Sequence, residues 1–444
     1  MLKKLILVLV TFIALFLAPS GSCQVFFNDL PVKQTAAEET SFVTLQRIEI
    51  IGNEKTKSEI ILRELLFERG SRVSLSKLIL AQKRILNTGL FSGARFDIIG
   101  NKDYYILIIT VYERWYIYPI PLLYINERSW NKLSYGLQLL YYNFLGRDIL
   151  LNLSAAFGYN PQFKFAYYNP WFFGDWKLFT NFMMYQGKVK AKNLELDGLE
   201  YDEKAIDWLL GKRFGHFTYL GAAYNYSIIS APATEHMTVS SSGKDNFSSV
   251  TLSLQFDNRD WIDLPHRGWD MKLWFKRAEI HNLHHYYKYG IDLRRYQPLS
   301  QQVSVALRNA TILSHGEIPL YDRTFFGYQE RIRGHFYDVV EGENLLFGGV
   351  ELRFPIVPIR YLNLPPVPGF EAYSRYLKFG VSGGIFYETG AVWFHTEGLN
   401  RDRFRTGFGA GVHFLLPYID VFRIDLGFNF EWEPQLIAEI KTAF

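Results

Sequence analysis

Residues 422–430 read Phe-Arg-Ile-Asp-Leu-Gly-Phe-Asn-Phe, a stretch in which every second side chain is apolar. The same period of two recurs at 250–257, 302–308 and 407–414. A period of two predicts β-strands with one apolar and one polar face. These segments approach the length of roughly nine to eleven residues that a tilted membrane-spanning strand requires.

The alternation begins at Trp115 and continues for about 330 residues with no convincing helix, too long for a single β-sandwich. An open sheet cannot lie in lipid with unpaired edges. We therefore predict a transmembrane antiparallel β-barrel over residues 115–433, with about sixteen strands at roughly 20 residues per strand and connection. Charged side chains such as Arg423, Asp425 and Glu351 would then face a wet lumen.

The composition agrees with a folded chain that has much apolar surface. Of 444 residues, 48% are apolar, 21% are charged and 17% are aromatic. The net charge of +4 is too small to argue for nucleic acid. Cys23 is the only cysteine, which excludes an intrachain disulfide and a cysteine metal cluster.

The N-terminus carries an export signal. Residues 1–23 combine Lys3 and Lys4 with the apolar stretch Leu5 to Leu17 and small residues where a signal peptidase would cut. A membrane anchor is the alternative. Lipidation of Cys23 also stays open, although Ser20 stands where a lipobox prefers an apolar residue. The mature chain would lie beyond the inner membrane, and residues 24–42 would form a polar linker.

Residues 43–114 predict a small α+β domain with the order β-α-α-β-β. The strands are expected at Val43–Ile51, Ala94–Ile99 and Tyr104–Val111. A capping box at Thr56-x-x-Glu59 predicts the start of one helix, and residues 74–88 predict the other.

This domain resembles a POTRA domain, the periplasmic module of bacterial outer-membrane assembly and transport proteins. The matching residues are Ile50-x-Gly52-Asn53, the Arg63-Glu64-Leu65 helix, and Arg84-x-Leu86-x-x-Gly89-Leu90-Phe91. The resemblance implies that the second strand is a sheet edge to which an extended client adds a strand. That edge strand would comprise Arg95, Phe96, Asp97, Ile98 and Ile99.

The barrel region resembles the BamA/TamA-like outer-membrane assembly superfamily (bacterial surface antigen barrels). Ile332-Arg333-Gly334-His335 is similar to the tip of the family's long lumenal loop, and Phe386-Tyr387-Glu388 matches its acidic wall position. The resemblance implies a loop clip made by Arg333, Gly334 and Glu388. A guanidinium held bidentately in a partly dehydrated lumen is a stronger clip than a surface pair. The alternative is that Arg333 merely packs in an ordered loop.

The end of the chain carries a second family pattern. Asp425, Gly427, Phe430 and Trp432 look like the terminal-strand signal by which outer-membrane barrels are recognised during assembly. Residues 434–444 would then be a C-terminal tail that extends the last strand or lies in the periplasm.

No catalytic, cofactor or metal site is predicted. Gly380-Val381-Ser382-Gly383-Gly384 fits a hydrolase motif but lacks the following helix that the motif needs. The histidines of residues 281–285 have no nearby carboxylate or cysteine that would complete a metal site. The chain is therefore not expected to be an enzyme.

The expected function is insertion or translocation of other proteins at the bacterial outer membrane, with the POTRA domain in the periplasm. The barrel would open between its first strand, near residues 116–124, and its last, near residues 422–432. Expected partners are unfolded outer-membrane or secreted polypeptides, outer-membrane lipids and accessory lipoproteins. The alternatives are a dedicated secretion or passive solute pore of the same barrel family, and a soluble β-rich binding protein.

Overall fold

The computed structural model describes residues 42–101, 104–125, 133–196, 199–233, 236–281, 283–363, 371–417 and 421–440. The predicted signal peptide, Cys23 and the linker up to residue 41 lie outside the described residues. None of the described helices is long and apolar enough to cross a membrane.

The N-terminal domain has the two predicted helices, and its sheet has four strands where three are predicted. The first helix ends at Leu62, so Arg63-Glu64-Leu65, expected to be helical, lies just beyond it. The elements of the domain are β1 (Phe42–Ile51), α2 (Ser58–Leu62), β2 (Arg72–Ser74), α3 (Leu75–Asn87), β3 (Phe91–Asn101) and β4 (Tyr104–Glu113). The sheet order is β2-β1-β4-β3, with β1 parallel to β4. Apolar side chains from helices and strands meet in one core, which includes the fully buried Leu45, Ile61 and Ile85.

Two local expectations for this domain need correction. The three-residue strand β2 was not predicted, because so short a segment carries no periodicity. Thr56 does not cap the first helix, whose N-cap is Lys57 with no side-chain cap. The Thr56 hydroxyl instead donates to Glu113 Oε1 at 2.6 Å, because this buried threonine faces the junction with the barrel.

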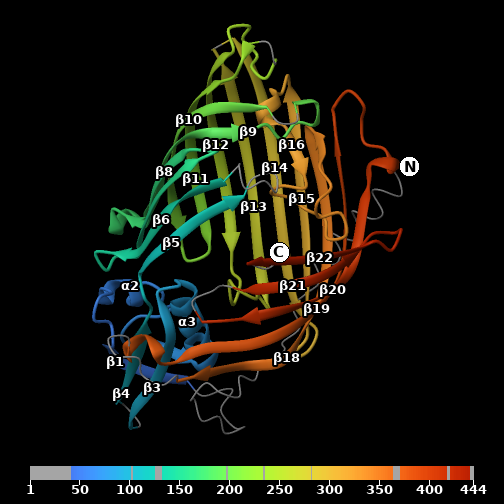
Figure 1. Cartoon of the computed structure of the whole chain (residues 1–444). Coiled ribbons are helices and arrows are strands. Elements are labelled where there is room, and N and C mark those ends of the chain that lie inside the picture. Colours follow the sequence, from blue (N-terminus) through green and yellow to red (C-terminus); the bar gives the residue numbers. More distant parts are fainter. Residues whose placement is uncertain are drawn as a thin grey trace.

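The second unit is an antiparallel sheet of sixteen strands, which curves round into a barrel (Figure 1). Its strands are β5 (Ile117–Ile125), β6 (Leu133–Phe144), β7 (Ile149–Gly158), β8 (Gln162–Phe172), β9 (Leu178–Lys190), β10 (Glu200–Phe214), β11 (Thr218–Ser230), β12 (Lys244–Asp257), β13 (Gly268–Ile280), β14 (His284–Pro298), β15 (Ser304–Gly316), β18 (Asn344–Leu362), β19 (Leu377–Trp393), β20 (Arg405–Leu415), β21 (Phe422–Phe428) and β22 (Pro434–Ile440). The predicted fold class and strand number are confirmed.

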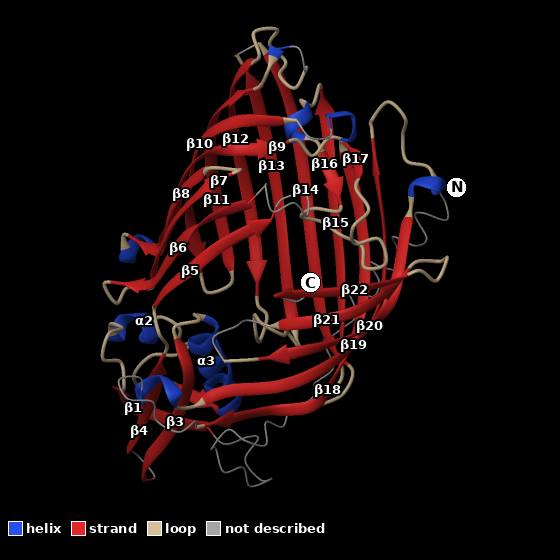
Figure 2. Ribbon diagram, viewed as in Figure 1, coloured by secondary structure: helices blue, strands red, loops and turns tan. Residues whose placement is uncertain are grey.

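Smaller elements lie in the connections (Figure 2). The loop between β15 and β18 holds a two-stranded sheet made of β16 (Thr324–Phe326) and β17 (Val340–Gly342). Short 3-10 helices occur at Gly174–Trp176, Leu194–Leu196, Leu320–Asp322, Glu371–Ser374 and Arg401–Arg403. We call the end of the barrel beside the N-terminal domain the near end and the opposite end the far end.

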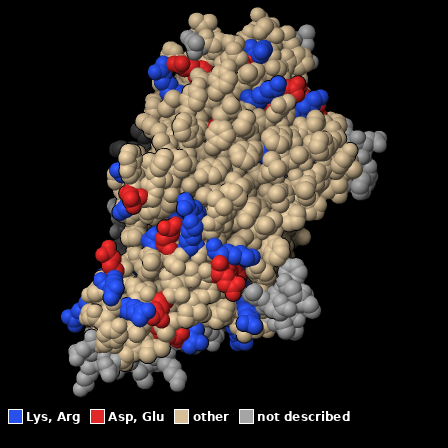
Figure 3. All heavy atoms as spheres, turned by 90° about the vertical axis from the view of Figure 1, so that its left-hand side faces the viewer, with Lys and Arg blue, Asp and Glu red and all other residues tan. Residues whose placement is uncertain are grey.

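The two faces of the barrel differ as the period of two predicts. Outward side chains such as Val250, Leu252 and Leu254 are apolar and 48%, 52% and 42% exposed. Inward side chains such as Arg423 and Asp425 are charged and buried. The space-filling view shows a wide area over the sheet without charged residues (Figure 3). Lipid is the solvent that suits such an outer face.

The expected end of the barrel is wrong. Residues 422–432 do not form the last strand, because β21 ends at Phe428 and a further strand, β22, follows the turn at 429–433. The expected tail is therefore mostly the sixteenth strand, paired with β21 from Pro434 to Ile440. Residues 441–444 lie outside the described residues. Leu436, Ile437 and Ile440 have the alternating burial of a strand, although this short run was too weak to identify from sequence.

Candidate functional site

The loop of residues 317–343 carries Arg333 to the inner wall of the barrel. The Arg333 backbone N–H donates to Glu388 Oε2 at 2.8 Å, and its Nε donates to Glu388 Oε1 at 2.8 Å. Its Nη1 reaches Glu351 Oε2 at 2.7 Å and Asp425 Oδ2 at 3.3 Å. The guanidinium also lies over the Phe386 ring, 3.5 Å from the centroid. One loop residue thus joins β18, β19 and β21.

The charges around Arg333 balance one another. Arg353 donates to Glu351 at 2.6 Å, and Arg423 pairs with Asp425. The six groups are three cations and three anions, and all are buried: Arg333, Arg353, Arg423, Glu351, Glu388 and Asp425. Removing one partner from such a cluster leaves a buried charge without compensation, which is strongly unfavourable. The cluster therefore specifies one position of the loop against the wall.

Glycines allow the loop backbone to lie directly on the strands. A Cβ on Gly407 of β20 would lie 1.6 Å from the Arg333 carbonyl oxygen. Gly334 has a φ of +103°, and a Cβ there would lie 2.4 Å from the Phe428 carbonyl oxygen. A Cβ on Gly427 would lie 2.8 Å from the Gly334 nitrogen. Glycine at these positions is required by the close approach of two backbones.

The same loop is fastened at other points of the lumen. Glu330 pairs with Arg308 of β15 at 2.8 Å. Glu341 accepts from Asn193 Nδ2 at 2.6 Å and from the Leu194 backbone N–H at 2.9 Å, in a far-end connection. The loop is therefore an internal element of the barrel, held on several sides.

The loop also contacts the last strand. Arg331 Nη1 lies 3.2 Å from Glu439 Oε1, and the Phe336 backbone N–H donates to Gln435 Oε1 at 2.7 Å. Glu439 pairs with Arg423 as well. These contacts connect β22 to the Arg333 cluster.

The first and last strands of the barrel are not paired with each other in the described residues. β5 pairs with β6 and β22 pairs with β21, and these two strands end the sixteen-stranded order. Each strand thus presents one unpaired backbone edge. We call the region between these edges the seam.

The predicted client-binding residues lie in β3, which is an edge of the N-terminal sheet. Ile98 and Ile99 are 39% and 56% exposed, and Arg95 pairs with Asp97 at 2.8 Å. Phe96 differs from its companions because it is buried in the domain core. The side chain of Phe96 therefore holds the strand in place, while Ile98 and Ile99 remain accessible.

The N-terminal domain contacts the near end of the barrel. Lys83 of α3 pairs with Asp260 at 2.9 Å, and Asn87 Oδ1 accepts from the Ile262 backbone N–H at 3.1 Å. Asn143 Nδ2 donates to Thr56 Oγ1 at 2.8 Å. We call this set of contacts the dock.

Two carboxyl groups at this junction have shifted pKa values: Asp260 of the dock, and Asp148, which pairs with Arg63 of the N-terminal domain. Burial disfavours the ionised form of Asp260, but Lys83 and the backbone N–H groups of Arg267 and His266 outweigh it and lower the Asp260 pKa. Burial raises the pKa of Asp148 to about 7, against the opposing effect of Arg63.

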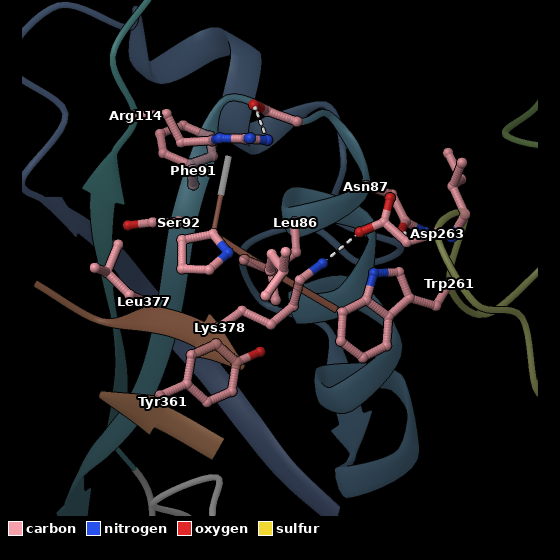
Figure 4. Close-up of a pocket in the computed structure, with 14 residues that line it drawn as sticks. Leu86, Asn87, Phe91, Ser92, Arg114, Trp261, Asp263, Tyr361, Leu377 and Lys378 are labelled. Atoms are coloured by element: carbon pink, nitrogen blue, oxygen red, sulfur yellow. Dashed lines mark hydrogen bonds and ion pairs between the residues drawn. The ribbon is translucent and has the colours of Figure 1, made fainter. Parts of the chain in front are cut away.

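A cavity of about 170 Å³ lies beside the dock (Figure 4). Asn87 and Phe91 border it from the N-terminal domain, and Trp261 and Lys378 border it from the barrel. Lys378 pairs with Asp263 and lies 4.7 Å from the Trp261 ring centroid. The barrel side chains that border the cavity already bind one another. The cavity is therefore a gap within the junction between the N-terminal domain and the barrel.

Sequence reasoning identified some of this site and missed the rest. It paired Arg333 with Glu388, and the structure places these residues together. It did not connect Glu351, Asp425 or β22 with Arg333, because contacts between distant strands leave no spacing in the sequence. Asp425 and Gly427 contact the loop from β21, whereas Phe430 and Trp432 lie in the far-end turn and are 65% and 69% exposed. Residues 380–384 lie within β19, away from any strand-to-helix turn.

Solved structures share this fold. BamA from Haemophilus ducreyi lacking POTRA domains 1–3 matches with a TM-score of 0.51 and 15% identity, over 89% of this chain and 83% of that chain. CdiB from Escherichia coli matches with a TM-score of 0.57 and 14% identity, over 90% and 75%. CdiB from Acinetobacter baumannii matches with a TM-score of 0.51 and 14% identity, over 89% and 73%.

Family models match both parts of the chain. The POTRA model, described as surface antigen variable number repeat, matches residues 43–114. The Omp85 superfamily domain matches residues 143–436, which is more than half of the chain. No curated protein matches the sequence significantly. The chain belongs to the Omp85 superfamily and carries a POTRA domain ahead of its barrel.

Proposed function

We propose that this protein inserts or translocates other polypeptides at the outer membrane, with its POTRA domain in the periplasm. Membership of the Omp85 superfamily supports outer-membrane protein insertion or secretion in general. The POTRA domain captures an unfolded client by strand addition, and the barrel then opens at the seam. Outer-membrane lipids face the apolar outer surface, and accessory lipoproteins are further candidate partners.

The observation that carries this proposal is that the first and last strands of the barrel, β5 and β22, are not hydrogen-bonded to each other at the seam. Unpaired N–H and C=O groups are costly in lipid and form a template for another strand. A client hairpin can therefore enter the membrane while its backbone groups are satisfied by the barrel. No covalent chemistry is required.

Strand length at the seam supports the same mechanism. β21, which neighbours the last strand, has seven residues, whereas β18 and β19 have 19 and 17. A membrane-spanning strand usually needs about 9–11 residues. Short strands favour a locally thinner bilayer, which reduces the cost of inserting a client there.

Capture by the POTRA domain is supported by the position of β3. Its outer edge is free of a neighbouring strand in the described sheet, and Ile98 and Ile99 beside it are exposed. Strand addition uses main-chain hydrogen bonds and is indifferent to most of the client sequence. This suits a receptor for many unfolded chains.

Depletion of the protein tests the proposal. Loss of the protein is expected to lower the folded amounts of other outer-membrane or secreted proteins, measured by quantitative proteomics of the envelope. A variant with Ile98→Pro and Ile99→Asp on the POTRA edge should reproduce part of the defect, because the Ile98 N–H faces away from β4 and its loss blocks strand addition there. Unchanged levels of all these proteins would contradict the proposal.

The alternative is a dedicated secretion or passive solute pore. Planar-bilayer conductance separates the two, because a passive pore conducts steadily whereas a lumen held by the 317–343 loop does not. We expect low conductance for the wild type and larger, fluctuating currents for Arg333→Ala. A steady wild-type current with no effect of depletion on other envelope proteins would favour the pore.

A further inference from the structure

Two prolines interrupt the first barrel strand, and they determine which side of the seam can accept a new strand. β5 contains Pro119 and Pro121 near its middle. We propose that β22, and not β5, is the edge to which an extended client strand pairs first. This inference rests on the proposed function, and it adds which strand acts as the template.

Hydrogen-bond alternation gives the direction of each β5 backbone group. In an antiparallel pair, alternate residues bond to the partner strand and the residues between them point away from it. The Tyr142 N–H donates to the Tyr116 carbonyl at 2.7 Å, and the register of β5 and β6 places these two residues opposite each other. Even-numbered residues of β5 therefore bond to β6.

A second bond supports this assignment independently. The Tyr159 N–H donates to the Leu133 carbonyl at 3.0 Å, so odd-numbered residues of β6 bond to β7. The even-numbered residues of β6 must then bond to β5. Residues 117, 119, 121, 123 and 125 of β5 consequently direct their backbone groups to the seam.

Pro119 and Pro121 thus stand at seam-facing positions. Proline has no N–H group, so the middle of this edge lacks two successive donors. The pyrrolidine ring also occupies the space that a partner carbonyl would enter. Proline on an edge strand is a known means of blocking edge-to-edge pairing. Only the two ends of β5 keep donors that face the seam.

The edge of β22 is different. The Asn258 N–H bonds to the Trp269 carbonyl at 3.0 Å, which sets the alternation of β12 and β13. The strand registers carry this alternation from β13 to β22, one strand at a time. The result is that the odd-numbered residues of β22 bond to β21. Leu436, Ala438 and Ile440 therefore direct their backbone groups to the seam.

These three seam-facing residues each have an N–H group, and Pro434 is confined to the start of β22. The neighbouring Gln435 and Glu439 side chains contact Phe336 and Arg331 of the loop. The template strand is thus fixed from inside by the loop while its outer edge stays free. An extended polypeptide can form a continuous ladder on β22, whereas β5 can bond to it only near its ends.

Site-specific photocrosslinking in the full-length protein, reconstituted in lipid vesicles, tests this asymmetry. A benzophenone side chain replaces Leu123 on β5 or Leu436 on β22, which are similarly exposed at 63% and 67%. The probe is a radioiodinated peptide with the sequence of residues 218–230, a proline-free barrel strand. Crosslinking at position 436 should exceed that at position 123 about tenfold, given two missing hydrogen bonds.

A second set of variants isolates the prolines. Pro119→Val with Pro121→Val restores two donors to the β5 edge and should raise crosslinking at position 123 to the level at 436. The control is Ile120→Val in the same strand, whose N–H faces β6, and it should leave the wild-type ratio unchanged. A heat-dependent gel shift verifies that each variant is folded.

The outcomes separate the two proposals. Equal or stronger crosslinking at position 123 in the wild type would overturn the asymmetry and leave the proposed function standing. The asymmetry would also be overturned, and the proposed function left standing, if the double proline variant folds but its ratio of crosslinking at position 123 to that at position 436 stays at the wild-type value. No crosslinking at either position would count against both proposals, because strand addition at the seam would then not occur.

Discussion

Arg333 is the residue on which the position of the lumenal loop depends. Its guanidinium compensates three buried carboxylates, and losing one member of such a cluster usually costs about 3–5 kcal/mol. We expect Arg333→Ala to lower the free energy of unfolding by about that amount. Urea unfolding in detergent micelles, followed by tryptophan fluorescence, measures it.

Arg331 provides the matched control for this variant. It belongs to the same loop, but both partners of its pair with Glu439 are about one-third exposed. Arg331→Ala should therefore change the unfolding free energy by only about 0–1 kcal/mol. Equal effects of the two variants would contradict a special role for Arg333. The double variant Arg333→Met, Glu388→Gln should recover part of the loss, because it removes a cation and an anion together.

Gly407 tests the close approach of loop and wall. A Cβ at this position would collide with the Arg333 carbonyl, so Gly407→Ala should displace the loop and cost about 1–3 kcal/mol. Limited proteolysis of the loop should become faster in this variant. Gly174→Ala is the control, since a Cβ there meets nothing within 4 Å. Unchanged proteolysis of Gly407→Ala would show that the loop does not lie against β20 in solution.

At the scale of elements, the dock should depend on pH through Asp260. Lys83 of the N-terminal domain is one of the groups that lower the Asp260 pKa, so the part of the shift due to Lys83 contributes to docking above the usual pKa of about 4. That contribution is lost as the pH falls through the docked value. Hydrogen exchange of α3 amides between pH 6 and pH 3, corrected for intrinsic rates, should show weaker protection at low pH.

Asp260→Asn is the comparison that isolates this carboxylate. This variant should be less protected at pH 6 and should lose part of the pH dependence. Asp148 has the opposite pH dependence. Because its pKa is raised, its contribution to the stability of the docked state falls as the pH rises toward 7. It is present in both proteins, so the difference between them reports Asp260. Identical profiles would rule out the Lys83–Asp260 pair as a determinant of docking.

The element β22 gives a further test, because it replaces an expected tail. Truncation after Glu433 removes Gln435 and Glu439, which contact the loop, and leaves the outer edge of β21 unpaired. We expect the truncated chain to lose its heat-dependent gel shift and to become protease-sensitive. A stable barrel without residues 434–444 would contradict the assignment of β22.

At the scale of the whole molecule, the outer face requires lipid or detergent. The side chains that cover it, such as Trp208, Leu252 and Ile385, are 52%, 52% and 53% exposed. Soluble monomers rarely expose large contiguous apolar patches. The mature protein should fold only with detergent or lipid and should show a heat-dependent shift in gel mobility. A monodisperse protein in plain buffer would contradict the membrane assignment.

The loop, the seam and the dock form one connected arrangement. The loop joins the Arg333 cluster to β22, β22 borders the seam, and the POTRA domain contacts the near end through Lys83 and Asp260. Each contact lies between elements that are distant in the chain. Their combined effect is to hold the barrel in one conformation while a single pair of strands stays unpaired.

Local patterns in the amino-acid sequence predict the fold class and the number of strands, and the resemblance to a known family predicts that Arg333 lies beside Glu388. Period-two alternation is local, and it follows directly from the two faces of a strand between lipid and water. The POTRA pattern is equally local, because glycines and apolar spacing mark its helices and strands.

The last strand, the other partners of Arg333 and the unpaired edges of the seam become evident only in the folded molecule. The identity of β22 depends on its pairing with β21. Glu351 and Asp425 reach Arg333 because the barrel brings three separate strands to one point. The seam-facing direction of Pro119 and Pro121 depends on which residues bond to β6. Register and long-range contact arise from closing the chain in space, and no local pattern of residues encodes them.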